Sequence, residues 1–275
     1  MSRLALRALT WNLYHGRDRP PDPRLYSWRS RLLRVTERNA THAQVNRGLL
    51  DEFAAVLADS HWDVALLQEC PPRWSEPLAR ATGAEAHCEL TSRNSLAALR
   101  SLAADLNPDL IGSNEGGSNL TLVRGRVLER RRLELTRGPR PERRVMVFTR
   151  AVPRGLDREV GIANLHASAG AARHAEAERE VLRAAVIARE WAGGAPSLFG
   201  GDLNLRPSES DVFDRLATDP GLAAPTAPDS LDHLLVAGLD VVEPPAAWPA
   251  HRREVATAEG TIRLSDHAPV AATFA

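Results

Sequence analysis

The sequence predicts an α+β sandwich, in which helices cover two packed β-sheets. Three observations predict this class. Short apolar segments typical of strands recur along the 275-residue chain, and runs of them are broken by single helical segments. A hydrophobic fraction of 43% is large enough to form a core. No internal repeat, low-complexity tract or long linker divides the sequence, so we expect residues 1–275 to form a single domain.

In the first half of the chain, the apolar pattern predicts two helices and five strands. The expected helices are Arg24–Ala58 and Asn94–Leu106, and the expected strands are Leu4–Asn12, Val64–Gln68, Asn119–Arg124, Arg126–Leu135 and Arg143–Ala151. Val45, Leu49 and Phe53 share one face of the first helix. Gly16–Pro23 is rich in Pro and Asp and is expected to be a loop, and Gly138–Pro139 is expected to turn the last strand pair.

In the second half, we expect four further strands: Gly161–Ala167, Pro196–Gly201, Leu231–Val236 and Ala268–Phe274. The segment Ala171–Trp191 has the strongest helical pattern, with Val181, Leu182 and Ala185 on its inward face. Ser208 has N-cap chemistry, with Asp211 three residues later, and predicts the start of a short helix.

Composition excludes several classes of protein. No apolar run approaches the roughly 18 residues of a membrane span, and the N-terminus lacks the apolar segment of a secretory signal. Cys70 and Cys88 cannot form a disulfide framework. We therefore expect a cytoplasmic protein with no membrane span and no obligate protein partner. The formal net charge is zero, so the chain lacks the basic surplus of a dedicated nucleic-acid binder.

Arginines gather in one part of the sequence. All 35 basic residues are arginine, and nine of them lie between Arg124 and Arg144. One interpretation is a strip that faces the phosphates of a nucleic acid. The other is a charged edge hairpin that resists aggregation. The sequence slightly favours the second.

Polar residues recur at the ends of the expected strands. Asp202 and Asn204 follow an apolar strand and stand two residues apart, so their side chains point the same way on an extended segment. Asp266 and His267 precede the last strand. Carboxylate, amide and imidazole groups at strand ends are suited to hold a divalent cation and to activate water, which indicates a hydrolase. We expect them to meet at one site on the rim of the sandwich.

Six short motifs occur in a fixed order: Thr10-Trp11-Asn12, Leu67-Gln68-Glu69, Asn164-Leu165-His166, Gly201-Asp202-Leu203-Asn204, Leu231-Asp232-His233 and Ser265-Asp266-His267. In this order they resemble the endonuclease/exonuclease/phosphatase superfamily, which includes deoxyribonuclease I, exonuclease III, apurinic/apyrimidinic endonucleases, neutral sphingomyelinases and inositol-polyphosphate 5-phosphatases. The resemblance covers nearly the whole chain. It implies a four-layer α/β/β/α sandwich of two packed, mostly antiparallel sheets, and metal-dependent cleavage of a phosphoester.

The sequence departs from the superfamily pattern at two places. Some members carry an acidic residue two positions beyond the first Asn, where this chain has Tyr14. The segment between Asn12 and Glu69 is also longer than expected, which predicts a helical insertion near residues 24–48.

The resemblance implies three metal-side residues, Asn12, Glu69 and Asp266. Glu69 is the expected ligand of Mg²⁺ or Mn²⁺, because Mg²⁺ prefers hard carboxylates and takes only one or two of them from the protein. Asn12 is expected to support the metal or a phosphate oxygen. Asp266 is expected to be a second carboxylate on the metal side.

The resemblance also implies five catalytic residues. Asp202 is expected to activate or orient the attacking water, with Asn204 holding the phosphate or fixing Asp202. Asp232 is expected to orient His267 and to raise the pKa of its imidazole. The charged ring then stabilises the transition state or protonates the leaving group. His166 is expected to donate to a non-bridging oxygen.

Three further residues are expected to contact the substrate. Asn119 precedes a strand and resembles a substrate-contacting asparagine of the superfamily. His15 follows the first motif and lies near the expected mouth of the site. Arg206 follows the Asp-x-Asn motif, and two interpretations are equally supported: a bidentate donor to a phosphate, or an exposed loop arginine. By contrast, His233 is expected to point away from Asp232 and to pack or face solvent.

The sequence therefore predicts metal-dependent hydrolysis of phosphodiesters, with a nuclease as the leading interpretation. A phosphomonoesterase or a lipid-headgroup phosphodiesterase on the same scaffold is the alternative. A catalytically silent binding protein is a third possibility, but all six motifs keep their reactive groups.

Overall fold

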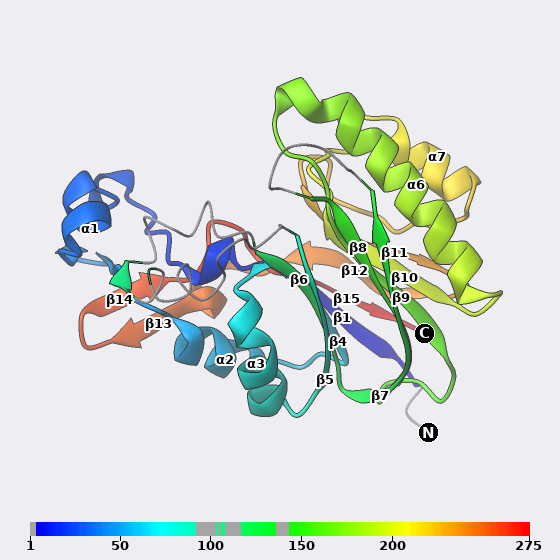
Figure 1. Ribbon diagram of the computed structural model, residues 1–275, viewed down its shortest axis with the longest axis horizontal. Coiled ribbons are helices and arrows are strands. Elements are labelled where there is room, and N and C mark those ends of the chain that lie inside the picture. Colours follow the sequence, from blue (N-terminus) through cyan, green and yellow to red (C-terminus); the bar gives the residue numbers. More distant parts are fainter. Residues whose placement is uncertain (1–3, 92–102, 104–105, 108–116, 136–142) are drawn as a thin grey trace.

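Two β-sheets pack face to face in the computed structural model, which describes residues 4–91, 103, 106–107, 117–135 and 143–275. Helices cover the outer face of each sheet (Figure 1). The predicted four-layer α/β/β/α sandwich is therefore confirmed. No helix among the described residues is both long and apolar enough to cross a membrane.

The larger sheet has six strands in the order β12-β15-β1-β4-β6-β5. Their bounds are β1 Leu6–Asn12, β4 Val64–Cys70, β5 Glu85–Leu90, β6 Ser118–Val123, β12 Val241–Ala247 and β15 Val270–Phe274. The smaller sheet has five strands in the order β11-β10-β9-β8-β7. Their bounds are β7 Gly125–Glu134, β8 Val145–Pro153, β9 Val160–His166, β10 Ser197–Asp202 and β11 Asp232–Ala237.

The remaining elements are short, apart from one long helix. The α-helices are α1 Trp28–Leu33, α2 Leu50–Ala58, α3 Ser75–Thr82, α6 His174–Ala192 and α7 Val212–Thr218. The 3-10 helices are η1 Tyr14–Gly16, η2 Pro23–Leu25, η3 Pro72–Trp74, η4 Ala171–Arg173 and η5 Ala250–Arg253. Two small hairpins pair β2 Glu37–Arg38 with β3 Ala43–Gln44, and β13 Glu254–Thr257 with β14 Gly260–Arg263.

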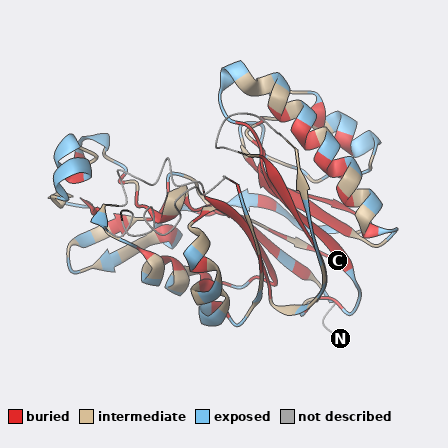
Figure 2. Cartoon of the chain, in the orientation of Figure 1, coloured by how far each residue is buried: buried red, intermediate tan, exposed pale blue. Residues whose placement is uncertain are grey.

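The core has three apolar layers, because the central strands are buried on both faces (Figure 2). Leu6 and Ala8 of β1 point between the two sheets. Leu9 and Trp11 alternate with them and pack beneath α2 and α3. The third layer lies between the smaller sheet and the helices α6 and α7. The alternation along β1 therefore joins two of the three core layers.

Each sheet contains one parallel strand pair, and these pairs create the rim where the polar residues gather. β1 runs parallel to β4, and β9 runs parallel to β10. The carboxyl ends of parallel neighbours lie at the same edge of a sheet. β11 is antiparallel to β10, so its first residue, Asp232, lies opposite the last residue of β10, Asp202.

The helix expected over Arg24–Ala58 is wrong for most of its length. α1 ends after six residues, because Arg34 adopts a left-handed conformation with φ of 56°. The side chain of Asn39 then accepts hydrogen bonds from the backbone N–H groups of Thr41 and His42 and forms the turn between β2 and β3. Of the predicted face, only Phe53 lies in a helix, α2, although Val45, Leu49 and Phe53 are all buried in the same core layer.

Two smaller expectations are not tested by the structure, and two other details differ from it. The helix over Asn94–Leu106 lies outside the described residues except for positions 103 and 106, and the turn Gly138–Pro139 lies wholly outside them. The short helix α7 begins at Val212, whose N–H is bonded by the hydroxyl of Ser210 rather than Ser208. Strands β5, β12, β13 and β14 are additions that the apolar pattern did not predict.

Most of the described arginines between Arg124 and Arg144 form hydrogen bonds or ion pairs within the protein. β7 and β5 are edge strands of the two sheets. Arg130 pairs with Glu85 at 3.1 Å and Arg132 with Glu89 at 3.5 Å, so ion pairs join the two edges. Arg124 donates to backbone carbonyls, among them that of Ser60 at 2.9 Å. This arrangement favours the interpretation of a charged edge.

Candidate active site

The polar strand ends of the two sheets meet at one rim of the sandwich. Asn12 ends β1, and its side-chain Nδ2 donates to Asp202 Oδ2 at 2.9 Å across the gap between the sheets. His166 ends β9 directly beside Asp202 in the parallel pair. Glu69 lies in β4, next to the strand that ends at Asn12. The structure thus brings together residues from positions 12 to 267 of the chain.

Asp202 is the buried carboxylate at the centre of this cluster. Its Oδ1 accepts the backbone N–H of Asn204 at 3.2 Å, in addition to the bond from Asn12 to Oδ2. Burial and then the charge of Asp232 raise the pKa of Asp202 to about 7. The side chain of Asn204 donates to the carbonyl of Ala167 at 3.1 Å, so Asn204 fixes both the loop and the carboxylate. A carboxylate with this pKa is suited to take a proton near neutral pH.

Asp232 and His267 form a hydrogen-bonded pair, as the sequence predicted. His267 Nδ1 lies 2.8 Å from Asp232 Oδ2, and the other ring nitrogen, Nε2, lies 3.9 Å from Asp202 Oδ2. Burial alone would lower the pKa of His267, but the hydrogen bond and charge of Asp232 raise it to about 10. The ring is therefore protonated at neutral pH. Its backbone is fixed by Ser265, whose hydroxyl accepts the N–H of His267 at 3.0 Å.

Glu69 lies between two imidazoles. Its Oε2 is 3.1 Å from His15 Nε2, and its Oε1 is 3.9 Å from His166 Nε2. Burial alone would raise the pKa of Glu69, but the imidazole of His15 and a hydrogen bond from Asn12 outweigh it and the pKa falls below its ordinary value. Burial and the charge of Arg144 lower the pKa of His166 to about 3, so this ring is neutral at neutral pH. Glu69 is thus held as an anion at the rim.

Backbone strain is concentrated at this cluster. Six described non-glycine residues have a positive φ, and five of them line the site: Tyr14 (51°), His15 (54°), Glu69 (49°), Asn204 (52°) and Ser265 (58°). The sixth, Arg34, ends α1. Such conformations cost about 1–3 kcal/mol each and persist only where the surrounding structure enforces them. Gly117 packs directly on the Glu69 backbone, since a Cβ at Gly117 would lie 2.7 Å from Glu69 Cα.

Three predicted site residues are placed differently from the rest. Asp266 is exposed and follows Ser265 at the edge of the cluster, so its expected metal role stays a prediction. Arg206 pairs with Glu209 at 3.3 Å on an exposed loop. Asn119 is fully buried and donates to the carbonyl of Val145 at 2.8 Å, and its Oδ1 makes no hydrogen bond to the described residues. A substrate contact by either Arg206 or Asn119 also stays a prediction.

His233 packs away from the cluster, as expected. Its Nε2 bonds the carbonyl of Leu205 at 2.9 Å, and its ring packs against Phe213.

Two features of the site were not predicted from the sequence. His15 contacts Glu69, whereas the sequence predicted only a position near the mouth of the site. Arg144 is buried, bonds the hydroxyl of Ser168 at 3.4 Å, and lies close enough to His166 to depress its pKa. It directly precedes β8, which is antiparallel to β9, so its position at a strand start is the signal that could have identified it.

The donor set fits a hard divalent cation at Glu69. Asp202, Asp232 and His267 also have ligand atoms within 4.8 Å of one another. However, His267 Nδ1 is hydrogen-bonded to Asp232 Oδ2 at 2.8 Å, so these two side chains already serve each other as partners. Glu69 is anionic, and a carboxylate oxygen is a ligand that Mg²⁺ or Mn²⁺ prefers. The amide nitrogen of Asn12 donates to Asp202 and to Glu69, so Asn12 holds the carboxylates in place. Glu69 is therefore the better candidate for a metal ligand.

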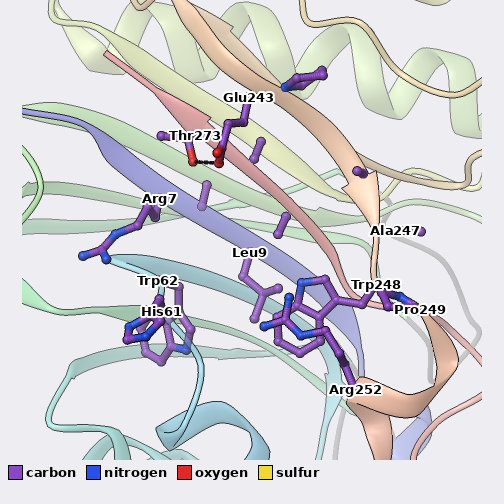
Figure 3. A pocket seen from close by; sticks show the side chains of 15 residues that line it. Arg7, Leu9, His61, Trp62, Glu243, Ala247, Trp248, Pro249, Arg252 and Thr273 are labelled. Carbon is purple, nitrogen blue, oxygen red and sulfur yellow. Dashed lines mark hydrogen bonds between the residues drawn. The ribbon is translucent and has the colours of Figure 1, made fainter. Parts of the chain in front are cut away.

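The pocket of about 630 Å³ in Figure 3 lies away from this cluster. It opens on the outer face of β1, β15 and β12, with Trp62 and Trp248 among its lining residues. Arg252 stacks on Trp248 with its guanidinium carbon 4.0 Å from the ring centroid. None of the polar residues of the rim lines it, so it is distinct from the candidate active site.

Residues 9–267 match the family model of the Endonuclease/Exonuclease/phosphatase family. The chain belongs to this family, whose members hydrolyse phosphoester bonds. The predicted resemblance is therefore confirmed. A comparison with curated protein sequences gave no match.

Solved structures of the same fold cover nearly the whole chain. The human Nocturnin catalytic domain with bound sulfate is similar over 99% of this chain and 95% of its own, with a TM-score of 0.64 at 16% identity. A mannosyl-6-phosphatase from Bacteroides thetaiotaomicron VPI-5482 is similar over 98% and 99%, with a TM-score of 0.64 at 13% identity. Truncated TDP2 from Caenorhabditis elegans is similar over 98% and 97%, with a TM-score of 0.57 at 17% identity. At these identities the similarity concerns the fold.

Proposed function

We propose that the chain is a metal-dependent phosphodiesterase that cleaves nucleic acid, with Glu69, Asp202 and His267 as its central groups. The observation that carries this proposal is the environment of Asp202. This buried carboxylate is fixed by Asn12 and lies near a protonated imidazole on one side and the anionic Glu69 on the other. Family membership supports hydrolysis of a phosphoester by this cluster.

Asp202 is the proposed general base. A phosphodiester is protected by its negative charge, so the enzyme has to neutralise the phosphoryl oxygens and align an attacking water. The pKa of about 7 lets Asp202 accept the proton of that water near neutral pH. Asn12 and the backbone N–H of Asn204 each donate a hydrogen bond to one oxygen of Asp202, which fixes the orientation of the carboxylate toward the attacking water.

His267 is the proposed source of positive charge and of a proton at Nε2. Its Nδ1 is hydrogen-bonded to Asp232, and its Nε2 lies on the side of Asp202, 3.9 Å from Oδ2. A charged ring stabilises the extra negative charge that develops on the phosphoryl oxygens. The neutral ring of His166 donates one further hydrogen bond to a non-bridging oxygen.

Glu69 is the proposed ligand of Mg²⁺ or Mn²⁺, supported by Asn12. A bound divalent cation would act as a Lewis acid on a phosphoryl oxygen. Glu69 is held beside His15 and against Gly117, so its carboxylate is oriented before any cation binds. This pre-orientation reduces the entropy that binding has to remove.

The experiment is a substrate panel assayed with Mg²⁺, Mn²⁺ or chelator: plasmid, single-stranded DNA, abasic duplex, RNA, sphingomyelin and bis(p-nitrophenyl) phosphate. The variant Asp202→Asn is compared with Asp214→Asn, which changes an exposed carboxylate on α7. We expect the first variant to lose about 10²–10⁴ in rate, the range for a positioned base, and the second to retain full rate. Equal rates for both variants would contradict the proposed base.

A lipid-headgroup phosphodiester is the second candidate substrate, and the surface of α1 favours it. Trp28, Leu32 and Leu33 on this short helix are 64%, 52% and 60% exposed. Arg29 and Arg31 are exposed on the same helix. Exposed apolar side chains among arginines are typical of segments that lie in the interface of an anionic bilayer.

Vesicle sedimentation separates the two candidate substrates. With a lipid substrate, the protein binds phosphatidylserine vesicles, and Trp28→Ser with Leu32→Ser releases it while hydrolysis of a small diester stays intact. Preferential cleavage of DNA or RNA without vesicle binding supports the nuclease.

A further inference from the structure

His15 has a position that its place in the sequence did not indicate. Its Nε2 lies 3.1 Å from Glu69 Oε2, although 54 residues separate the two in the chain. Two ligands that occupy adjacent positions on an octahedral cation with bonds of about 2.1 Å are roughly 3 Å apart. The two atoms therefore have the separation of neighbouring ligands on one cation.

The backbone that carries His15 is held in a costly conformation. Tyr14 and His15 are consecutive and both have a positive φ, of 51° and 54°. Asn12 Oδ1 accepts the N–H of Tyr14 at 2.9 Å, so the proposed metal-side amide also fixes this turn. Gly16 packs against Trp74, where a Cβ would lie 2.2 Å from the ring.

These contacts explain why the turn keeps its strain. Strained backbone of this kind gathers at functional sites, because only a rigid surrounding holds it. The strained turn places the imidazole of His15 against the Glu69 carboxylate.

We propose that His15 binds the divalent cation together with Glu69 and thereby makes the site select Mn²⁺ over Mg²⁺. The inference rests on the proposed metal-dependent function and adds a ligand and an ion preference to it. Mg²⁺ strongly prefers oxygen ligands and keeps its waters. Imidazole nitrogen suits first-row transition ions, whose affinity for nitrogen sites exceeds that of Mg²⁺.

The experiment measures metal binding directly. Mn²⁺ is titrated by electron paramagnetic resonance and Mg²⁺ by calorimetry, on the full chain and on His15→Ala. The control is His42→Ala, because His42 Nε2 also pairs with a glutamate, Glu254, at 3.2 Å but lies outside the site. We expect His15→Ala to lose about 10–100-fold in Mn²⁺ affinity and less than about threefold in Mg²⁺ affinity. The control keeps both affinities.

A second variant and a spectroscopic signal separate a ligand from a hydrogen-bond donor. His15→Asn keeps a residue that tolerates a positive φ, so it is the informative variant if alanine prevents folding. Electron spin echo modulation of bound Mn²⁺ should contain a ¹⁴N contribution that both variants diminish. Equal losses for the two ions, or an unchanged ¹⁴N signal, would overturn the proposal and leave His15 as a hydrogen-bond partner of Glu69.

Failure of the proposed function gives a different result. In that case the unaltered chain binds neither ion, or Glu69→Gln leaves binding unchanged, and hydrolysis continues in excess chelator. Loss of Mn²⁺ selectivity in His15→Ala with retained binding at Glu69 supports both the function and the inference.

Discussion

Asp232→Asn should convert the enzyme into one that works only at lower pH. The substitution keeps an oxygen that can accept the hydrogen bond from His267 Nδ1 at 2.8 Å but removes the negative charge. That carboxylate is the main reason that the pKa of His267 lies near 10 rather than at its ordinary 6.5. Without the charge, burial lowers the pKa of the ring and only the charges of Asp202 and Asp266 still raise it, so the pKa falls toward its ordinary value.

The size of the effect follows from the fraction of protonated rings. A raised pKa means that the charged form is present below about pH 10 in the unaltered chain and is lost above it. With a pKa of 6.5, about 3% of the rings are charged at pH 8, so a full return to this value lowers the rate there ~30-fold. At pH 6 about three quarters remain charged, and the loss from charge is less than about twofold.

The assay is the pH profile of kcat/KM for bis(p-nitrophenyl) phosphate at saturating metal. We expect the alkaline limb to move from near pH 10 toward pH 6.5 in Asp232→Asn. The double variant with His267→Ala should be little slower than His267→Ala alone, because residues that act as a unit are not additive. An equal rate loss at pH 6 and pH 8 would refute the assignment of a charge-stabilising pair.

Two further predictions concern packing and the charged edge. Gly117→Ala should reduce activity by about 10²-fold with metal present, because its Cβ would lie 2.7 Å from Glu69 Cα and small misplacements of reacting groups are costly. The control variant Gly48→Ala should keep its activity, because Gly48 has open space around it. Equal rates for the two variants would show that Glu69 tolerates displacement. Arg130→Gln with Arg132→Gln should leave the salt dependence of DNA binding unchanged, because both arginines already pair with glutamates; a shallower salt slope in a filter-binding titration would restore the phosphate-facing interpretation.

The strand ends of the site were predictable because they combine an apolar run with a polar residue directly after it. Asn12, Glu69, His166 and Asp202 all follow this pattern, and parallel pairing brings their strands to one rim. The pairing of Asp232 with His267 was predictable only through the family motifs, since no local pattern links residues 35 positions apart.

Other features depend on tertiary contacts that a single sequence does not express. The helical pattern of residues 24–58 was overridden by a left-handed Arg34 and by backbone N–H groups that donate to the side chain of Asn39. The contact of His15 with Glu69 depends on two consecutive positive φ values, which are uncommon for residues other than glycine. Strand β5 was missed because its residues mix charged and apolar side chains at the edge of a sheet.

The central claim is that a divalent cation held by Glu69 drives hydrolysis of a phosphodiester at this rim. Its most direct test is the rate of bis(p-nitrophenyl) phosphate hydrolysis by metal-depleted protein before and after Mn²⁺ is restored, for the unaltered chain and for Glu69→Gln. We predict that restored metal raises the rate of the unaltered chain at least ~100-fold, and that Glu69→Gln stays near the depleted rate with an unchanged Tm. Full activity in excess chelator, or full activity of Glu69→Gln, would contradict the account.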